Sequence, residues 1–169
     1  MGRLRHGTVE VRLRLSTALG LDQHPATVPG YGAVTAPIAR ELIHARHHGE
    51  WRVVLVDPDG HLQHVLLARR RPAGPRGRRE PRGSAPRHAI VEIQVPARLL
   101  AALDPHAHPT WTALLRELQV RLGELDHPGP PRESPPDHAR RTPGAETDRW
   151  TRVRDRHCII PCCRQPAHR

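Results

Sequence analysis

Thr8-Val-Glu-Val-Arg-Leu-Arg-Leu15 is the stretch of sequence that decides the fold class. Apolar side chains occupy every second position of this stretch, and charged side chains stand between them. Successive side chains of a strand point to opposite faces of a sheet. The pattern therefore predicts a strand that packs one face against a core and turns a charged face away from it.

A turn and a helix are predicted after this strand. Pro29-Gly-Tyr-Gly32 is typical of a turn or loop, because glycine and proline favour backbone angles that turns require. A helix is expected to begin after Thr35, whose hydroxyl can cap it, and to run to about His48. Gly49 follows and is expected to end that helix.

Two further β-prone runs lie at residues 51–56 and 61–67. They flank Asp57-Pro-Asp-Gly60, a strong turn sequence, and so predict two strands joined by a tight turn. Residues 1–67 are therefore expected to form a small α+β region.

The second half of the chain predicts one more strand and several helices. Residues 89–95 restore a strand pattern, and a short helix is expected at about 96–103, so that residues 89–127 form a strand with amphipathic helices. The clearest helix, at about 109–126, carries an apolar stripe for a core or a partner: Trp111, Leu114, Leu115, Leu118, Leu122 and Leu125. A last short helix is expected at about 147–156.

Two stretches, 68–88 and 128–146, are rich in proline or arginine and are expected to be disordered linkers. Eight arginines against one glutamate give residues 69–87 a charge of +7, out of +10 for the whole chain. These arginines either contact nucleic-acid phosphates or reflect codon bias, since lysine, asparagine and phenylalanine are absent from the chain. The expected fold class is α+β, with small strand and helix units joined by linkers and an incomplete zinc knuckle at the C-terminal end.

The composition narrows the class of protein. Hydrophobic residues make up 37% of the chain and charged residues 26%, which is enough for one modest domain. No apolar run approaches the roughly 18 residues of a transmembrane helix, and the N-terminal residues lack the apolar stretch of a signal peptide. A cytoplasmic protein without a membrane partner is expected. No glycine-rich phosphate loop is present, so no small-molecule cofactor is expected.

The most specific signal is the C-terminal stretch Arg152-Val-Arg-Asp-Arg-His-Cys-Ile-Ile-Pro-Cys-Cys-Arg-Gln-Pro-Ala-His-Arg169. Cys158 and Cys163 are separated by four residues that include a proline, so they can form a tight knuckle and supply half of a tetrahedral zinc site. The other nearby candidate ligands lack the second-pair spacing of a structural zinc module: His157, Cys162 and His168. Reduced thiols without a metal are the alternative.

This stretch resembles the opening of the HNH endonuclease module in bacterial proteins that carry the domain of unknown function 222. The resemblance is carried by an Arg-Asp pair, the knuckle and a Pro-Ala pair: Arg154-Asp155, Cys158, Pro161, Cys163 and Pro166-Ala167. Earlier parts of the chain resemble the same family: residues 11–17, 19–22, 29–32, the helix beginning near Ala36, and 57–60. The resemblance covers most of residues 8–67 and 88–169.

The resemblance implies that full-length relatives hydrolyse DNA phosphodiesters, using a histidine to activate water and a divalent cation such as Mg²⁺. The family's Asp-x-Asp-His and second cysteine and histidine cluster are not reached before Arg169, and Cys162 stands where the family usually has glycine. The chain is therefore expected to be a truncated member that lacks the catalytic residues and does not cleave DNA. The candidate DNA contacts are the arginines around the knuckle: Arg152, Arg154, Arg156 and Arg164.

Several alternatives stay open beside this family assignment. The four arginines can equally form a solvated helix face. The chain can also be a non-enzymatic basic protein that binds nucleic acid through residues 69–87, or an inert gene remnant. His44, His47 and His48 have a metal-like spacing, but chance explains it in a chain with 14 histidines and no nearby carboxylate or cysteine partner.

Overall fold

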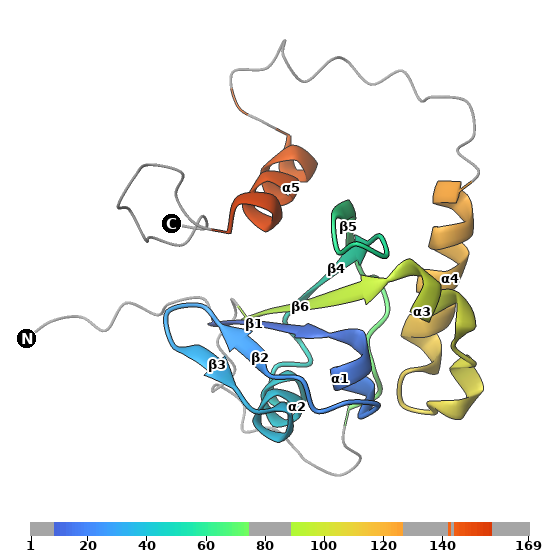
Figure 1. Ribbon diagram of the computed structural model, residues 1–169, viewed down its shortest axis with the longest axis horizontal. Coiled ribbons are helices and arrows are strands. Elements are labelled where there is room, and N and C mark those ends of the chain that lie inside the picture. The colour runs from blue at the N-terminus through green and yellow to red at the C-terminus, as the bar shows by residue number, and fades with distance from the viewer. Residues whose placement is uncertain (1–8, 75–88, 127–141, 143, 157–169) are drawn as a thin grey trace, which may run out of the picture.

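The computed structural model describes residues 9–74, 89–126, 142 and 144–156 (Figure 1). These residues form a mixed six-stranded sheet with helices on both of its faces, which confirms the α+β class. In chain order the elements are β1 (Val9–Arg14), α1 (Leu15–Leu19), β2 (Ala26–Val28), β3 (Gly32–Val34), α2 (Ala36–Ala45), β4 (Glu50–Val56), β5 (Leu62–Leu67), β6 (Ala89–Pro96), α3 (Ala97–Ala102), the 3-10 turn η1 (Pro105–Ala107), α4 (Thr112–Asp126) and α5 (Ala145–Asp155).

The strand order across the sheet is β3-β2-β1-β6-β4-β5. The three central strands are parallel, and their register places Arg12, Glu92 and Arg52 side by side. Antiparallel hairpins complete both edges, β2–β3 beside β1 and β5 beside β4. Strand β6 follows the predicted linker at 68–88, whereas β1 and β4 precede it. Residues on both sides of that stretch therefore share one sheet.

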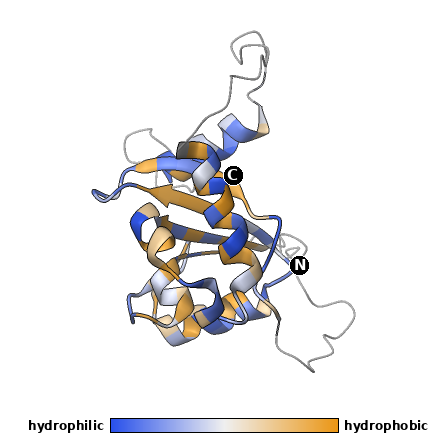
Figure 2. Cartoon of the chain, turned by 90° about the vertical axis from the view of Figure 1, so that its right-hand side faces the viewer, coloured by the Kyte–Doolittle hydropathy of each residue, from blue (hydrophilic) through white to orange (hydrophobic). Residues whose placement is uncertain are grey.

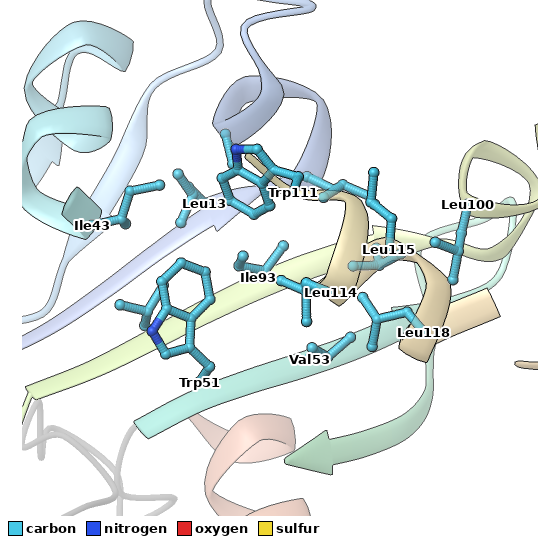
Figure 3. Packing of buried hydrophobic residues seen from close by; sticks show 14 of the residues in the cluster. Leu13, Ile43, Trp51, Val53, Ile93, Leu100, Trp111, Leu114, Leu115 and Leu118 are labelled. Carbon is cyan, nitrogen blue, oxygen red and sulfur yellow. The ribbon is translucent and has the colours of Figure 1, made fainter. Parts of the chain in front are cut away.

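One face of the sheet carries the main hydrophobic core, which helices α1 to α4 cover. The tryptophans of β4 and of the turn before α4, Trp51 and Trp111, pack edge to face with ring centroids 5.8 Å apart (Figure 3). The leucines of α4 pack against the same strands, and Leu114, Leu115 and Leu118 are fully buried. The apolar stripe predicted for this helix therefore faces the core of the same chain rather than a partner.

The opposite face of the sheet is mixed in character. Near β5 it carries a small apolar cluster that α5 covers, and toward β1 it carries charged side chains. Figure 2 shows the central strands mostly in the apolar colour and the helices with a mixture of apolar and hydrophilic residues. Among the described residues, no helix combines the length and the apolar character that a bilayer-spanning segment requires.

Some predicted boundaries differ from the structure. Helix α2 ends at Ala45 rather than near His48, and Thr35 stands at its N-cap, but its hydroxyl accepts no hydrogen bond from the helix. Gly49 does not cap this helix but lies where β4 approaches β6, and a Cβ atom on it would meet the carbonyl oxygen of Ala89 at 2.5 Å. Most of the two predicted linkers, 68–88 and 128–146, lies outside the described residues, because 75–88, 127–141 and 143 are not described.

Candidate functional site

Helix α5 leads directly into the cysteine segment, and its own sequence explains why it forms. Glu146 and Asp148 stand in its first turn, and Arg152 and Arg154 stand in its last turn. Acidic side chains near the N-terminus and basic ones near the C-terminus complement the helix dipole, each by about 0.3–1 kcal/mol. An 11-residue helix is nevertheless marginal alone in water, so α5 depends on its contact with the sheet.

That contact is a small apolar cluster on the second face of the sheet. Val153 of α5 is buried against Val54, Val56 and Val65, and Trp150 packs at the border of the cluster. Burying a valine or leucine side chain contributes about 1.5–3 kcal/mol, so one buried valine and a half-buried tryptophan hold the helix only loosely.

An ion pair adds to this anchor. Arg156, the residue after α5, donates a hydrogen bond from Nη1 to Oε1 of Glu92 in the central strand β6. Glu92 is 2% exposed, which is unusual for a carboxylate without a partner. Arg156 is also the non-glycine residue of the described chain with a positive φ, at φ 58° and ψ −42°. Such a backbone conformation costs of the order of 1–3 kcal/mol and persists where surrounding contacts hold it.

The neighbours of Glu92 are two further arginines. Arg12 of β1 and Arg52 of β4 lie beside it in register. Each of them donates from Nε to a glutamate of its own strand at 2.6 Å, Arg12 to Glu10 and Arg52 to Glu50. With Arg156 in place, the three pairs carry equal positive and negative charge. Buried charges require such pairing, so docking of α5 gives the buried carboxylate of Glu92 a cationic partner from outside the sheet.

The other arginines predicted as DNA contacts lie on the surface of α5. Arg152 donates to Asp148 at 3.0 Å, and Arg154 donates to Asp155 at 2.7 and 3.0 Å. The hydrogen bond from Arg154 lowers the pKa of Asp155, and the same bond raises the pKa of Arg154. The side chains of Arg152 and Arg154 are 38% and 55% exposed. Cys158, Cys163 and Arg164 lie outside the described residues.

One group of possible metal ligands lies at the turn between β4 and β5. Oxygen and nitrogen atoms of Asp57, Asp59 and His61 lie within 4.8 Å of one another. The turn already uses this carboxylate, because Asp57 Oδ1 accepts backbone N–H groups of Asp59 at 2.9 Å and of His61 at 2.8 Å. The backbone hydrogen bond from His61 lowers the pKa of Asp57. Local turn structure therefore accounts for the cluster.

The predicted histidine trio forms no comparable group in the described part of the chain. The rings of His47 and His48 pack edge to face, with centroids 4.1 Å apart. His44 lies exposed on α2. The interpretation of this spacing as chance stays a prediction.

Glu92 is the residue of this face that sequence analysis missed. The signal was an acidic side chain in the middle of the apolar strand 89–95, because a carboxylate in a central strand requires a partner. No protein-family model, no curated protein and no solved structure matches the chain. The family resemblance of the cysteine segment therefore stays a prediction.

Proposed function

We propose that this chain is a DNA-binding member of the HNH endonuclease family, in which the six-stranded sheet holds the helix that leads into the cysteine segment. The observation that supports this proposal most is the anchoring of α5. Val153 and the Arg156–Glu92 pair attach the helix to the central strands two residues before Cys158. The stretch that resembles the nuclease module thus begins at a fixed point of the sheet.

The ion pairs of α5 support different roles for its arginines in the proposal. Exposed ion pairs such as those of Arg152 and Arg154 contribute about 0–1 kcal/mol, so a phosphate can replace their carboxylate partners at little cost. Removing Arg156 from Glu92 would take away the partner that this buried carboxylate gains from α5, at a cost of about 2 kcal/mol after allowance for Arg12, Arg52 and solvent screening. The proposal therefore keeps Arg152 and Arg154 as DNA contacts and gives Arg156 an anchoring role.

The proposed activity is binding without cleavage. The 169 residues contain no counterpart of the family's Asp-x-Asp-His motif, which would supply the base. Zinc at Cys158 and Cys163 is part of the proposal on the strength of their spacing. It is measured by the zinc content of the purified protein beside that of the Cys158→Ser variant.

Salt-dependent binding to duplex DNA tests the proposal. The dissociation constant is measured by fluorescence anisotropy over a range of NaCl concentrations for the native chain, the Arg152→Ala/Arg154→Ala variant and Arg98→Ala. Each lost phosphate contact lowers the salt slope by about 1, so the double variant should lose about 2. Arg98 lies exposed on α3 and serves as the control. Equal affinities for the double variant and the control contradict the assignment.

A plasmid-nicking assay with Mg²⁺ or Mn²⁺ separates binding from cleavage. Nicking that survives Cys158→Ser would contradict the proposal of binding alone. Deletion of residues 75–87 tests the basic-protein alternative, because it removes five of the eight arginines of residues 69–87. Binding through that stretch should weaken strongly, whereas binding through α5 persists.

A further inference from the structure

Residues of β5, α4 and α5 line a groove. Its volume is about 270 Å³, which is room for a phosphate group and part of the molecule attached to it. The end of β5 forms its floor, and four charged side chains line it with that strand: Arg69, Arg121, Glu146 and Arg149.

Positive charge predominates in this groove. Within the described chain, the side chains of Arg69 and Arg149 make no ion pair with a carboxylate. Arg121 is held in place, because its Nη1 donates to the carbonyl oxygen of Leu67 at 2.7 Å and lies 3.5 Å from Oε1 of Glu117. The groove therefore combines one fixed guanidinium group with two that have no carboxylate partner among the described residues.

Backbone N–H groups occupy both carboxylate oxygens of Glu117. Its carboxylate accepts the backbone N–H of Arg69 at 2.9 and 3.1 Å and that of Arg70 at 2.6 Å. These bonds fix the chain at the point where the arginine-rich stretch begins. The side chains of Arg69, Arg70 and Arg71 stay exposed beside the groove.

Glu146 is the acidic side chain of the groove. It lies in the first turn of α5 and is exposed, so it stands at the rim. A carboxylate at this position weakens the attraction for an anion. Because Glu117 already pairs with Arg121, the charges at the groove then leave an excess of one arginine. Removing Glu146 is therefore expected to strengthen the binding of an anion.

We infer that this groove is a phosphate-binding site formed by Arg69, Arg121 and Arg149. Guanidinium groups bind phosphate oxygens through charge-assisted, often bidentate hydrogen bonds. The inference rests on the proposed function for the source of the phosphate, which is the DNA backbone. Arg149 also belongs to the helix that carries Arg152, so one bound strand can contact both the groove and the surface of α5.

Two measurements test the groove, with Arg98→Ala as the control that removes the same charge as Arg149→Ala. Binding of duplex DNA is measured for Arg149→Ala, Arg69→Ala/Arg149→Ala, Glu146→Ala and the control Arg98→Ala. At about 0.1 M salt each lost phosphate contact weakens binding by about tenfold, so Arg149→Ala and the double variant should bind progressively more weakly. Glu146→Ala should bind more tightly than the native chain. Thermal unfolding is then followed with added inorganic phosphate, which should raise the Tm of the native chain more than that of the double variant.

The outcomes separate the groove from the proposed function. Groove variants that bind DNA as Arg98→Ala does overturn the inference, even where Arg152→Ala/Arg154→Ala loses binding. If the native chain does not bind DNA but its Tm rises with phosphate, and this rise is lost in Arg69→Ala/Arg149→Ala, the groove binds phosphate but DNA is not its ligand. No effect of either ligand overturns both proposals.

Discussion

Replacing Arg156 with alanine is expected to release α5 from the sheet while the sheet itself stays folded. Removal of one partner from a buried ion pair costs about 3–5 kcal/mol. The side chain of Arg156 is 32% exposed. Arg12 and Arg52 lie beside Glu92, and their positive charges offset part of the negative charge of its carboxylate. We therefore expect a loss of about 2 kcal/mol in the docking free energy of α5, after allowance for solvent screening. A loss of this size raises the open fraction of the helix about 30-fold.

Hydrogen exchange followed by mass spectrometry measures this opening directly. Peptides from Ala145–Asp155 should exchange about 30-fold faster in Arg156→Ala, and peptides from β4 and β6 should not change. Arg152→Ala is the matched control, because it removes the same charge from an exposed pair on the same helix. Its effect should stay below about 1 kcal/mol.

A double-mutant cycle with Glu92→Gln tests the cause. If the ion pair anchors the helix, the two substitutions together should cost less than the sum of the single changes. A coupling energy below about 0.5 kcal/mol, the value typical of independent sites, would refute the reasoning. Equal exchange rates in Arg156→Ala and Arg152→Ala would refute it as well.

Three further predictions concern stability. Gly49→Ala should lower the free energy of unfolding by about 1–3 kcal/mol in urea titrations, since the new Cβ meets the carbonyl of Ala89, whereas Gly123→Ala in open space on α4 should raise it by up to about 1 kcal/mol. Trp111→Ala should cost about 3–5 kcal/mol by the same measurement, and a loss below 1 kcal/mol would argue against its burial in the core. Burial alone raises the pKa of Asp22, but hydrogen bonds from Ser16, Thr17 and His24 lower it from 3.8 to about 2. The ionised Asp22 carboxylate therefore stabilises the folded chain fully above about pH 4, and this stabilisation is lost as the pH falls through 2. The Tm of the Asp22→Asn variant should fall less than that of the native chain over this range, by the equivalent of about 1 kcal/mol.

The longer elements were predictable from the sequence because each carries its own periodic pattern. The alternation in residues 8–15, the turn at 57–60 and the leucine stripe of α4 are local signals, and the structure confirms the elements that they predict. Strands β2 and β3 were missed because three residues each, Ala26–Val28 and Gly32–Val34, are too few to show alternation. Only their turn was visible, as Pro29–Gly32.

The sites depend on contacts between distant residues, which local patterns do not show. Glu92 and Arg156 are 64 residues apart, and no periodicity links a strand to a residue beyond a later helix. Arg69 and Arg149 likewise line one groove although they lie far apart in the sequence, because α5 docks beside β5. The arginine count alone pointed to the stretch 69–87 as a whole. In the structure its first residue, Arg69, is the one held at the groove, because its backbone N–H donates hydrogen bonds to the carboxylate of Glu117.

The position of β6 between β1 and β4 has a consequence for how the chain folds. It is the last of the six strands in the sequence, yet both parallel pairings of the sheet require it. During synthesis the hairpin of β4 and β5 can form early, because its strands are adjacent. β1 and β4 keep open edges until residues 89–96 emerge, and open edges invite aggregation. A nascent chain stalled before Ala89 should therefore aggregate, and supplying β6 as a separate peptide should rescue it.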